Sequence, residues 1–121
     1  MQDKHSLLKS FGFAAEGIRT EFKKGRNFRI QILIGIIALI LGAIFKISPT
    51  EWFDLIIVIA SVLILELINT AVEAIVDMVS PDINPKAKIA KDVSAGAVLV
   101  ASIASVAVGI LIFLPKILQI I

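Results

Sequence analysis

The chain has 121 residues, enough for one domain, and 58% of them are hydrophobic, whereas soluble domains use about 45–50%. A chain this short cannot bury so much apolar surface in its own core, which argues against a soluble domain and places the excess against lipid or other subunits. The net charge of +2 arises mainly from two basic blocks, at residues 4–29 and 86–91, and beside such apolar runs these favour a membrane surface over nucleic acid.

Residues 1–29 are predicted to form an amphipathic helix that lies on the cytoplasmic leaflet. Apolar side chains recur among the basic ones with the spacing of one helix face, at Leu7, Phe11, Ala14, Ile18 and Phe22. Anionic lipid would hold this helix as a simple anchor, and the polar residues farther along the chain suggest that it also covers a site.

Three apolar stretches follow, each close to the roughly 20 residues that a helix needs to cross a hydrocarbon core. We expect membrane-spanning helices over residues 30–47, 52–79 and 85–114, the last with a cytoplasmic extension at its start. The predicted fold class is therefore an all-α integral membrane protein, with one surface helix and three spans in a single membrane domain, 1–121.

Local signals mark where these helices begin and end. The segment Ser48–Glu51 has the pattern of a capping box with proline in the first turn, which opens the second span. Pro81 disfavours helical geometry at the residue before it and is expected to end that span. Asn84 followed by Pro85 predicts the next helix start, and Pro115 is expected to close the third span.

The basic blocks also predict the orientation. With three spans, the N-terminal segment and the 80–92 loop share one side of the membrane, and both are rich in lysine or arginine, which indicates the cytoplasm. The 46–54 loop and the C-terminus then lie outside, each with one lysine.

Polar residues interrupt the second span along one helix face: Glu66, Asn69, Thr70, Glu73 and Asp77. Carboxylates inside a span are expensive and mark function by default. At 1.5 Å per residue, Glu66 lies about 20 Å and Glu73 about 30 Å from Phe53, so the stripe rises from the cytoplasmic headgroups into the acyl region. This placement suits a site that joins a water-soluble reactant to a lipid. Interhelical hydrogen bonding is the alternative, and three acids with an amide suit it poorly.

At the start of the third helix, Lys88, Lys91 and Asp92 share a face. Carboxylates can hold Mg²⁺ and lysine can balance phosphate charge, so these groups and the acidic stripe favour phosphoryl transfer. Taken alone, the lysines are more typical of charges that set topology. The chain has no P-loop, GxGxxG or HExxH pattern and no cysteine. Its single histidine, His5, is expected to be a solvated surface residue.

Small residues recur every four positions in the third span, at Ala97, Ala101, Ser105 and Gly109. Such spacing lets helices approach closely. Because one three-helix chain would struggle to enclose a charged site, we expect a homo-oligomer; packing within one subunit is the alternative.

These motifs resemble the prokaryotic diacylglycerol kinase family. The resemblance covers most of the chain and is carried by ELINTAVEAIVD at 66–77, AKD at 90–92 and AGAVL at 95–99, with GIR at 17–19 and RNF at 26–28. The ending at 113–116 is more similar to the Gram-positive branch, chiefly undecaprenol kinases. The resemblance implies a homotrimer with shared sites in the bacterial inner membrane, N-terminus cytoplasmic. It implies transfer of the ATP γ-phosphoryl group, with Mg²⁺, to a lipid hydroxyl: undecaprenol first, with diacylglycerol as the alternative.

The resemblance also assigns roles by position. Glu66 would be the general base and Glu73 a metal ligand, while Asn69 would hold the polar site together. Nucleotide contacts would come from Lys91 (on phosphate), Asp92, Asp77 and Arg19. One departure is visible: the family usually has a second metal-ligating glutamate immediately before the Arg26-Asn27 pair, and here that position is Gly25. Glu21 lies four residues earlier on the same helix face and is the candidate replacement.

Two other classes of function stay open at this point. An ion- or proton-relay subunit of a transporter would use the acidic stripe, but it predicts acids across the full depth of the membrane. The outer half of the second span, residues 53–65, carries only Asp54 at its rim. A structural assembly subunit would not need three carboxylates on one face.

Overall fold

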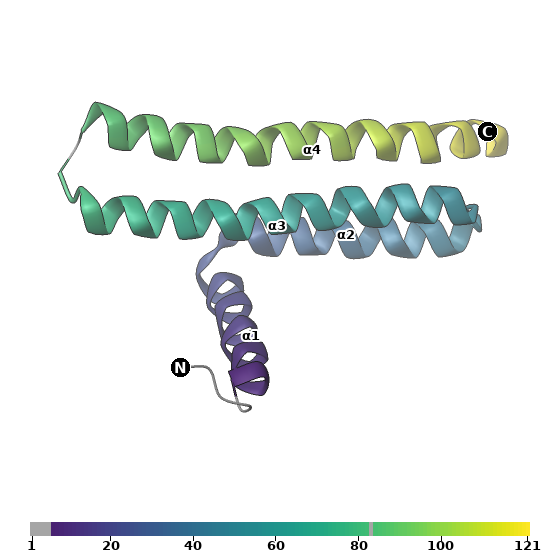
Figure 1. The fold of residues 1–121 in the computed structure, drawn as a ribbon. Coiled ribbons are helices and arrows are strands. Elements are labelled where there is room, and N and C mark those ends of the chain that lie inside the picture. The colour runs from purple at the N-terminus through teal and green to yellow at the C-terminus, as the bar shows by residue number, and fades with distance from the viewer. Residues whose placement is uncertain (1–5, 83) are drawn as a thin grey trace.

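The computed structural model describes residues 6–82 and 84–121, which form four helices. These are α1 (Ser6–Lys24), α2 (Arg26–Phe45), α3 (Pro49–Val79) and α4 (Pro85–Ile120). The last three lie side by side, while α1 runs away from the start of α2 (Figure 1). By length and composition, α2, α3 and α4 are each apolar enough to cross a membrane, so the predicted all-α fold with three spans is confirmed. His5 lies outside the described residues.

The first helix ends earlier than predicted. We expected one helix through residue 29, but α1 stops at Lys24 and residues 26–29 begin α2. The break falls at Gly25, whose backbone is extended (φ −90°, ψ 100°), because glycine weakens a helix interior. The guanidinium of Arg29 donates hydrogen bonds to the carbonyls of Phe22 and Lys23 at 2.8 and 2.9 Å, which satisfies the last turn of α1. The change of direction therefore rests on Gly25 and Arg29 together.

The connections between the long helices follow their local signals. The Ser48 hydroxyl accepts from the Glu51 N–H and the Glu51 carboxylate accepts from the Ser48 N–H, which confirms the predicted capping box. At the other end, α3 stops at Val79, and the Asn84 side chain caps α4 as expected. The resulting α3–α4 hairpin has the most extensive helix–helix contact, and its closed end extends past the start of α2 (Figure 1).

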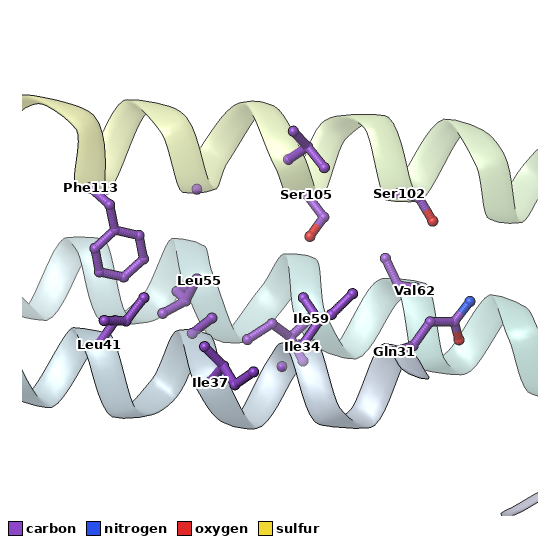
Figure 2. Close-up of a pocket in the computed structure, with 14 residues that line it drawn as sticks. Gln31, Ile34, Ile37, Leu41, Leu55, Ile59, Val62, Ser102, Ser105 and Phe113 are labelled. Carbon is purple, nitrogen blue, oxygen red and sulfur yellow. The ribbon is translucent and has the colours of Figure 1, made fainter. Parts of the chain in front are cut away.

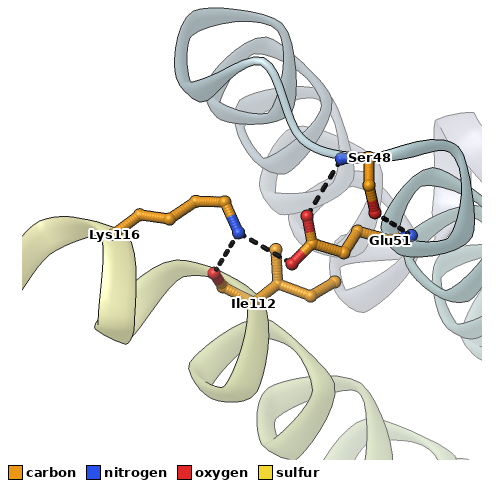
Figure 3. A network of polar contacts seen from close by, with 4 residues as sticks. All are labelled: Ser48, Glu51, Ile112 and Lys116. Atoms are coloured by element: carbon orange, nitrogen blue, oxygen red, sulfur yellow. Dashed lines mark hydrogen bonds and ion pairs between the residues drawn. The ribbon is translucent and has the colours of Figure 1, made fainter.

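The third span does not close at Pro115, contrary to our prediction; α4 continues through it to Ile120. Pro115 cannot donate the helical hydrogen bond to the Leu111 carbonyl, so contacts with α3 must hold the helix beyond this point. The Lys116 ammonium donates to the Ile112 carbonyl at 3.1 Å and pairs with the Glu51 carboxylate at 2.7 Å (Figure 3). Near this pair, the buried apolar core is formed by Ile47, Leu55, Ile112 and Phe113. Tertiary contacts thus hold the final turns against α3.

Replacing Lys116 by methionine should therefore fray the end of α4 and lower the melting temperature, because the ion pair with Glu51 is lost. Thermal unfolding in detergent, followed by circular dichroism, measures the change. Lys46→Met, which removes the same charge from an exposed turn residue, is the control. Equal melting temperatures for the two variants would contradict this account.

Candidate active site

Among residues 6–82 and 84–121, three polar side chains are buried, and two of them come from the predicted stripe. Glu66 and Asn69 on α3 are each 8% exposed, and Glu21 near the end of α1 is 6% exposed. Burying such groups is unfavourable unless they gain partners, so their neighbours decide what the site can do. Glu66 contacts α2 through Gln31, and Glu21 contacts α3 through Thr70.

The partner of Glu66 is a residue that the sequence analysis missed. Gln31, in the second turn of α2, donates a hydrogen bond from Nε2 to Glu66 Oε1 at 3.1 Å. The second amide atom, Gln31 Oε1, is buried and has no partner among the described residues. The available signal was a lone amide inside an otherwise apolar span, which is expensive unless it is paired. Gln31 therefore fixes the carboxylate that we predicted as the base.

Glu21 is held one helical turn farther along α3. Thr70, four residues after Glu66, donates its hydroxyl to Glu21 Oε2 at 2.5 Å. The Glu21 carboxylate also lies against Gly25: a Cβ added there would sit 2.9 Å from Glu21 Cδ and 3.0 Å from Glu21 Oε2. The space beside residue 25 is thus filled by the carboxylate of Glu21. This geometry favours the prediction that Glu21 supplies the carboxylate that the family usually has at position 25.

The remaining predicted residues lie farther toward the closed end of the α3–α4 hairpin. Asp77 pairs with Lys91 at 2.6 Å across the two helices, and both side chains are substantially exposed. Asp92 pairs with Lys88 on its own helix instead, at 2.5 Å. Glu73 is exposed between the buried cluster and the Asp77–Lys91 pair. Arg19 is exposed on α1, two residues before Glu21. The structure therefore pairs Glu66 with Gln31 and Glu21 with Thr70. The other predicted residues lie outside these two contacts: Glu73, Asp77, Lys91, Asp92 and Arg19.

The donor set fits a magnesium ion that is completed by phosphate. Among residues 6–82 and 84–121, no three carboxylates or histidines gather closely enough to hold a metal by themselves. Mg²⁺ does not need such a cage, because proteins usually bind it through one or two carboxylates plus substrate phosphates. Glu21 contacts Thr70, and Glu73 follows Thr70 by one turn. Beside them, the buried oxygen Asn69 Oδ1 lacks a hydrogen-bond partner in this part of the chain, as expected where a ligand supplies the missing donor.

Comparison with known proteins gives a consistent result. The sequence pattern of the prokaryotic diacylglycerol kinase family matches residues 12–113. An undecaprenol kinase of Bacillus subtilis is 40% identical over 110 residues, which cover 91% of this chain and 89% of the relative. A diacylglycerol kinase of Synechocystis is 40% identical over 115 residues, covering 94% of this chain and 66% of the relative. A diacylglycerol kinase of Escherichia coli is 27% identical over 100 residues, 83% of this chain and 82% of the relative.

Proposed function

Because the chain belongs to the prokaryotic diacylglycerol kinase family, we propose that it transfers the γ-phosphoryl group of ATP to the hydroxyl of undecaprenol. The lipid kinase class follows from the named relatives. The polyprenol acceptor is supported by a 40% identical undecaprenol kinase that aligns along nearly its whole length. The observation that supports phosphoryl transfer is the position of Glu66, a buried carboxylate that accepts a hydrogen bond from Gln31 within a largely apolar helix.

In this mechanism, Glu66 takes the proton of the lipid hydroxyl while the hydroxyl oxygen forms a bond to the γ-phosphorus and the bond to the β-phosphate oxygen breaks, leaving ADP and a lipid phosphate. The Gln31 amide orients the carboxylate. Lys91 exchanges its contact with Asp77 for the nucleotide phosphates. Glu73 and Glu21 would hold Mg²⁺, which neutralises phosphate charge when bound.

We also propose that the kinase works as a homotrimer in the bacterial inner membrane, with its N-terminus in the cytoplasm. The basic residues near α1 and at the α3–α4 turn support this orientation. Glu73 and Asp77 are exposed within one chain and Lys91 is half-buried, so a neighbouring subunit would help to enclose the reacting phosphates. Exposed small residues on α4, Ala97 among them, offer a surface for such contact.

The proposed activity is tested by incubating the purified protein in detergent with Mg²⁺ and ATP labelled at the γ-phosphate, with undecaprenol and diacylglycerol in parallel reactions. Label should enter both lipids or undecaprenol alone, with the higher kcat/KM for undecaprenol. A higher value for diacylglycerol would transfer the proposal to the alternative acceptor. No labelled lipid with either acceptor would contradict kinase activity.

Replacing Lys91 by methionine should raise the KM for ATP by about tenfold, because one charge-assisted contact to phosphate is lost. Steady-state kinetics at saturating lipid measures this change. Lys86→Met is the matched control, since Lys86 is exposed five residues earlier on α4 and the charge change is the same. Equal ATP KM values for the two variants would show that Lys91 acts only through the general positive charge of this region.

A further inference from the structure

An apolar groove runs along the three long helices, α2, α3 and α4. It has a volume of about 310 Å³ and is lined by α2, α3 and α4. Figure 2 shows Gln31 at one end, Phe113 and Leu41 at the other, and Ser102 and Ser105 directed from α4 toward the facing helices. Apart from these three polar residues, the lining is apolar or glycine.

The groove stays open because α4 presents small side chains to it. A Cβ added at Gly109 would meet nothing within 4 Å, whereas one added at Gly35 on α2 would lie 3.0 Å from Ile59. The α2–α3 wall is thus tightly packed, and the free width lies on the α4 side. Phe113, 8% exposed, and Leu55, 2% exposed, belong to the buried core at the outer end. The groove therefore has a packed outer end and one polar end.

The polar end leads directly to the proposed base. Gln31 lines the groove and also donates to the Glu66 carboxylate. Gln31 Oε1 is buried and lacks a partner among the described residues, so this end offers an unused hydrogen-bond acceptor beside Glu66. A molecule that combines an apolar chain with a terminal hydroxyl matches this arrangement of apolar wall and buried acceptors.

The dimensions indicate the kind of chain. The groove extends along α2 from Gln31 to Leu41, a length of roughly 15 Å. Its volume of about 310 Å³ divided by this length gives a mean cross-section of about 20 Å² for the groove. That width suits one extended hydrocarbon chain.

We propose that this groove binds a single hydrocarbon chain of the acceptor lipid, with the lipid hydroxyl at Gln31 and Glu66. The proposal rests on the lipid kinase function above and adds a rule of specificity. Alcohols with one long chain fit, and a lipid with two acyl chains leaves its second chain outside the groove. Acceptor choice is therefore set by α4, at Ser102, Ser105 and Gly109, as well as by the polar site.

Gly109→Leu fills the groove and tests the proposal against Ala107→Leu, which adds the same side chain at an exposed position of α4. Phosphoryl transfer is measured with undecaprenol and with a short-chain prenol that reaches Glu66 without filling the groove. In Gly109→Leu, the ratio of kcat/KM for the long to the short acceptor should fall by about tenfold or more, because several buried CH₂ groups lose their contacts. Ala107→Leu should keep the wild-type ratio.

An unchanged ratio in Gly109→Leu would overturn the proposal. An equal loss with both acceptors, together with dissociation of the oligomer in detergent, would also overturn it and assign the groove to a second copy of the chain. Photo-crosslinking with a long prenol carrying a diazirine near its hydroxyl gives a readout independent of turnover. It should label groove residues in the wild type and much less in Gly109→Leu. Labelling without any phosphoryl transfer would reject the proposed function but retain the groove as a lipid site, and labelling elsewhere would reject the groove.

Discussion

Glu66→Gln is expected to slow phosphoryl transfer by about 10²–10⁴-fold, the usual contribution of a positioned general base. Glutamine has nearly the same shape, and its side-chain oxygen can still accept the hydrogen bond from Gln31. What it loses is the capacity to take the proton of the lipid hydroxyl. The defect should therefore appear in kcat, while the KM for ATP and the melting temperature stay close to wild type.

Glu16→Gln is a matched control for this substitution, because Glu16 is an exposed acid on α1 away from the buried cluster. It should retain the wild-type rate. Transfer by Glu66→Gln within twofold of wild type would exclude Glu66 as the base. A large loss accompanied by unfolding would instead mean that the Gln31–Glu66 contact is structural.

The second large effect concerns Glu21. Glu21→Gln should raise the Mg²⁺ concentration needed for half-maximal rate as severely as Glu73→Gln does, by at least about tenfold. Glutamine at position 21 can still accept from Thr70, so the packing of α1 on α3 is kept while the negative charge is lost. Titration of the rate with Mg²⁺ at fixed ATP measures both variants. An unchanged Mg²⁺ titration in Glu21→Gln would remove Glu21 from the metal site.

Gly25→Ala gives an independent approach to the same carboxylate. Its Cβ would lie 2.8 Å from the Glu21 carbonyl oxygen and 3.0 Å from Glu21 Oε2. The backbone at the α1–α2 break and the carboxylate must therefore both shift, so the Mg²⁺ requirement should rise although no charge is removed. Gly17→Ala on α1, the helix that carries Glu21, is the control, because an added Cβ there meets nothing within 4 Å. Identical Mg²⁺ titrations for the two alanine variants would mean that the position of the Glu21 carboxylate does not affect metal binding.

Features set by neighbouring residues could be predicted from the sequence, and features set by distant contacts could not. The capping box at Ser48–Glu51 and the cap at Asn84 depend on side chains within three residues of the backbone groups that they bind, and both predictions are confirmed. Pro115 carries an equally strong local signal, yet α4 continues through it. The Lys116–Glu51 pair that accompanies this continuation joins residues 65 positions apart, so no local pattern could reveal it.

The candidate site shows the same division. Helical spacing placed Glu66 and Asn69 on one face with Glu73, but it could not tell that the first two are buried and the third exposed. Their burial depends on where α1 and α2 meet α3, and the hairpin extends beyond that meeting point (Figure 1). Gln31 was missed for the same reason, since its partner is 35 positions away. The resemblance to a family supplied the roles of individual residues, which spacing alone did not give.

The most direct test of the account measures how much labelled phosphoryl group passes from γ-labelled ATP to lipid. The wild type and three variants react in the same detergent with Mg²⁺ and undecaprenol, and the lipid is then extracted. The variants are Glu66→Gln, Glu73→Gln and Lys91→Met. The account predicts abundant label for the wild type and at least about a tenfold lower initial rate for each variant at subsaturating ATP and Mg²⁺. Wild-type rates in all three variants would contradict it, because phosphoryl transfer would then not depend on the ionisable groups at this end of α3 and α4.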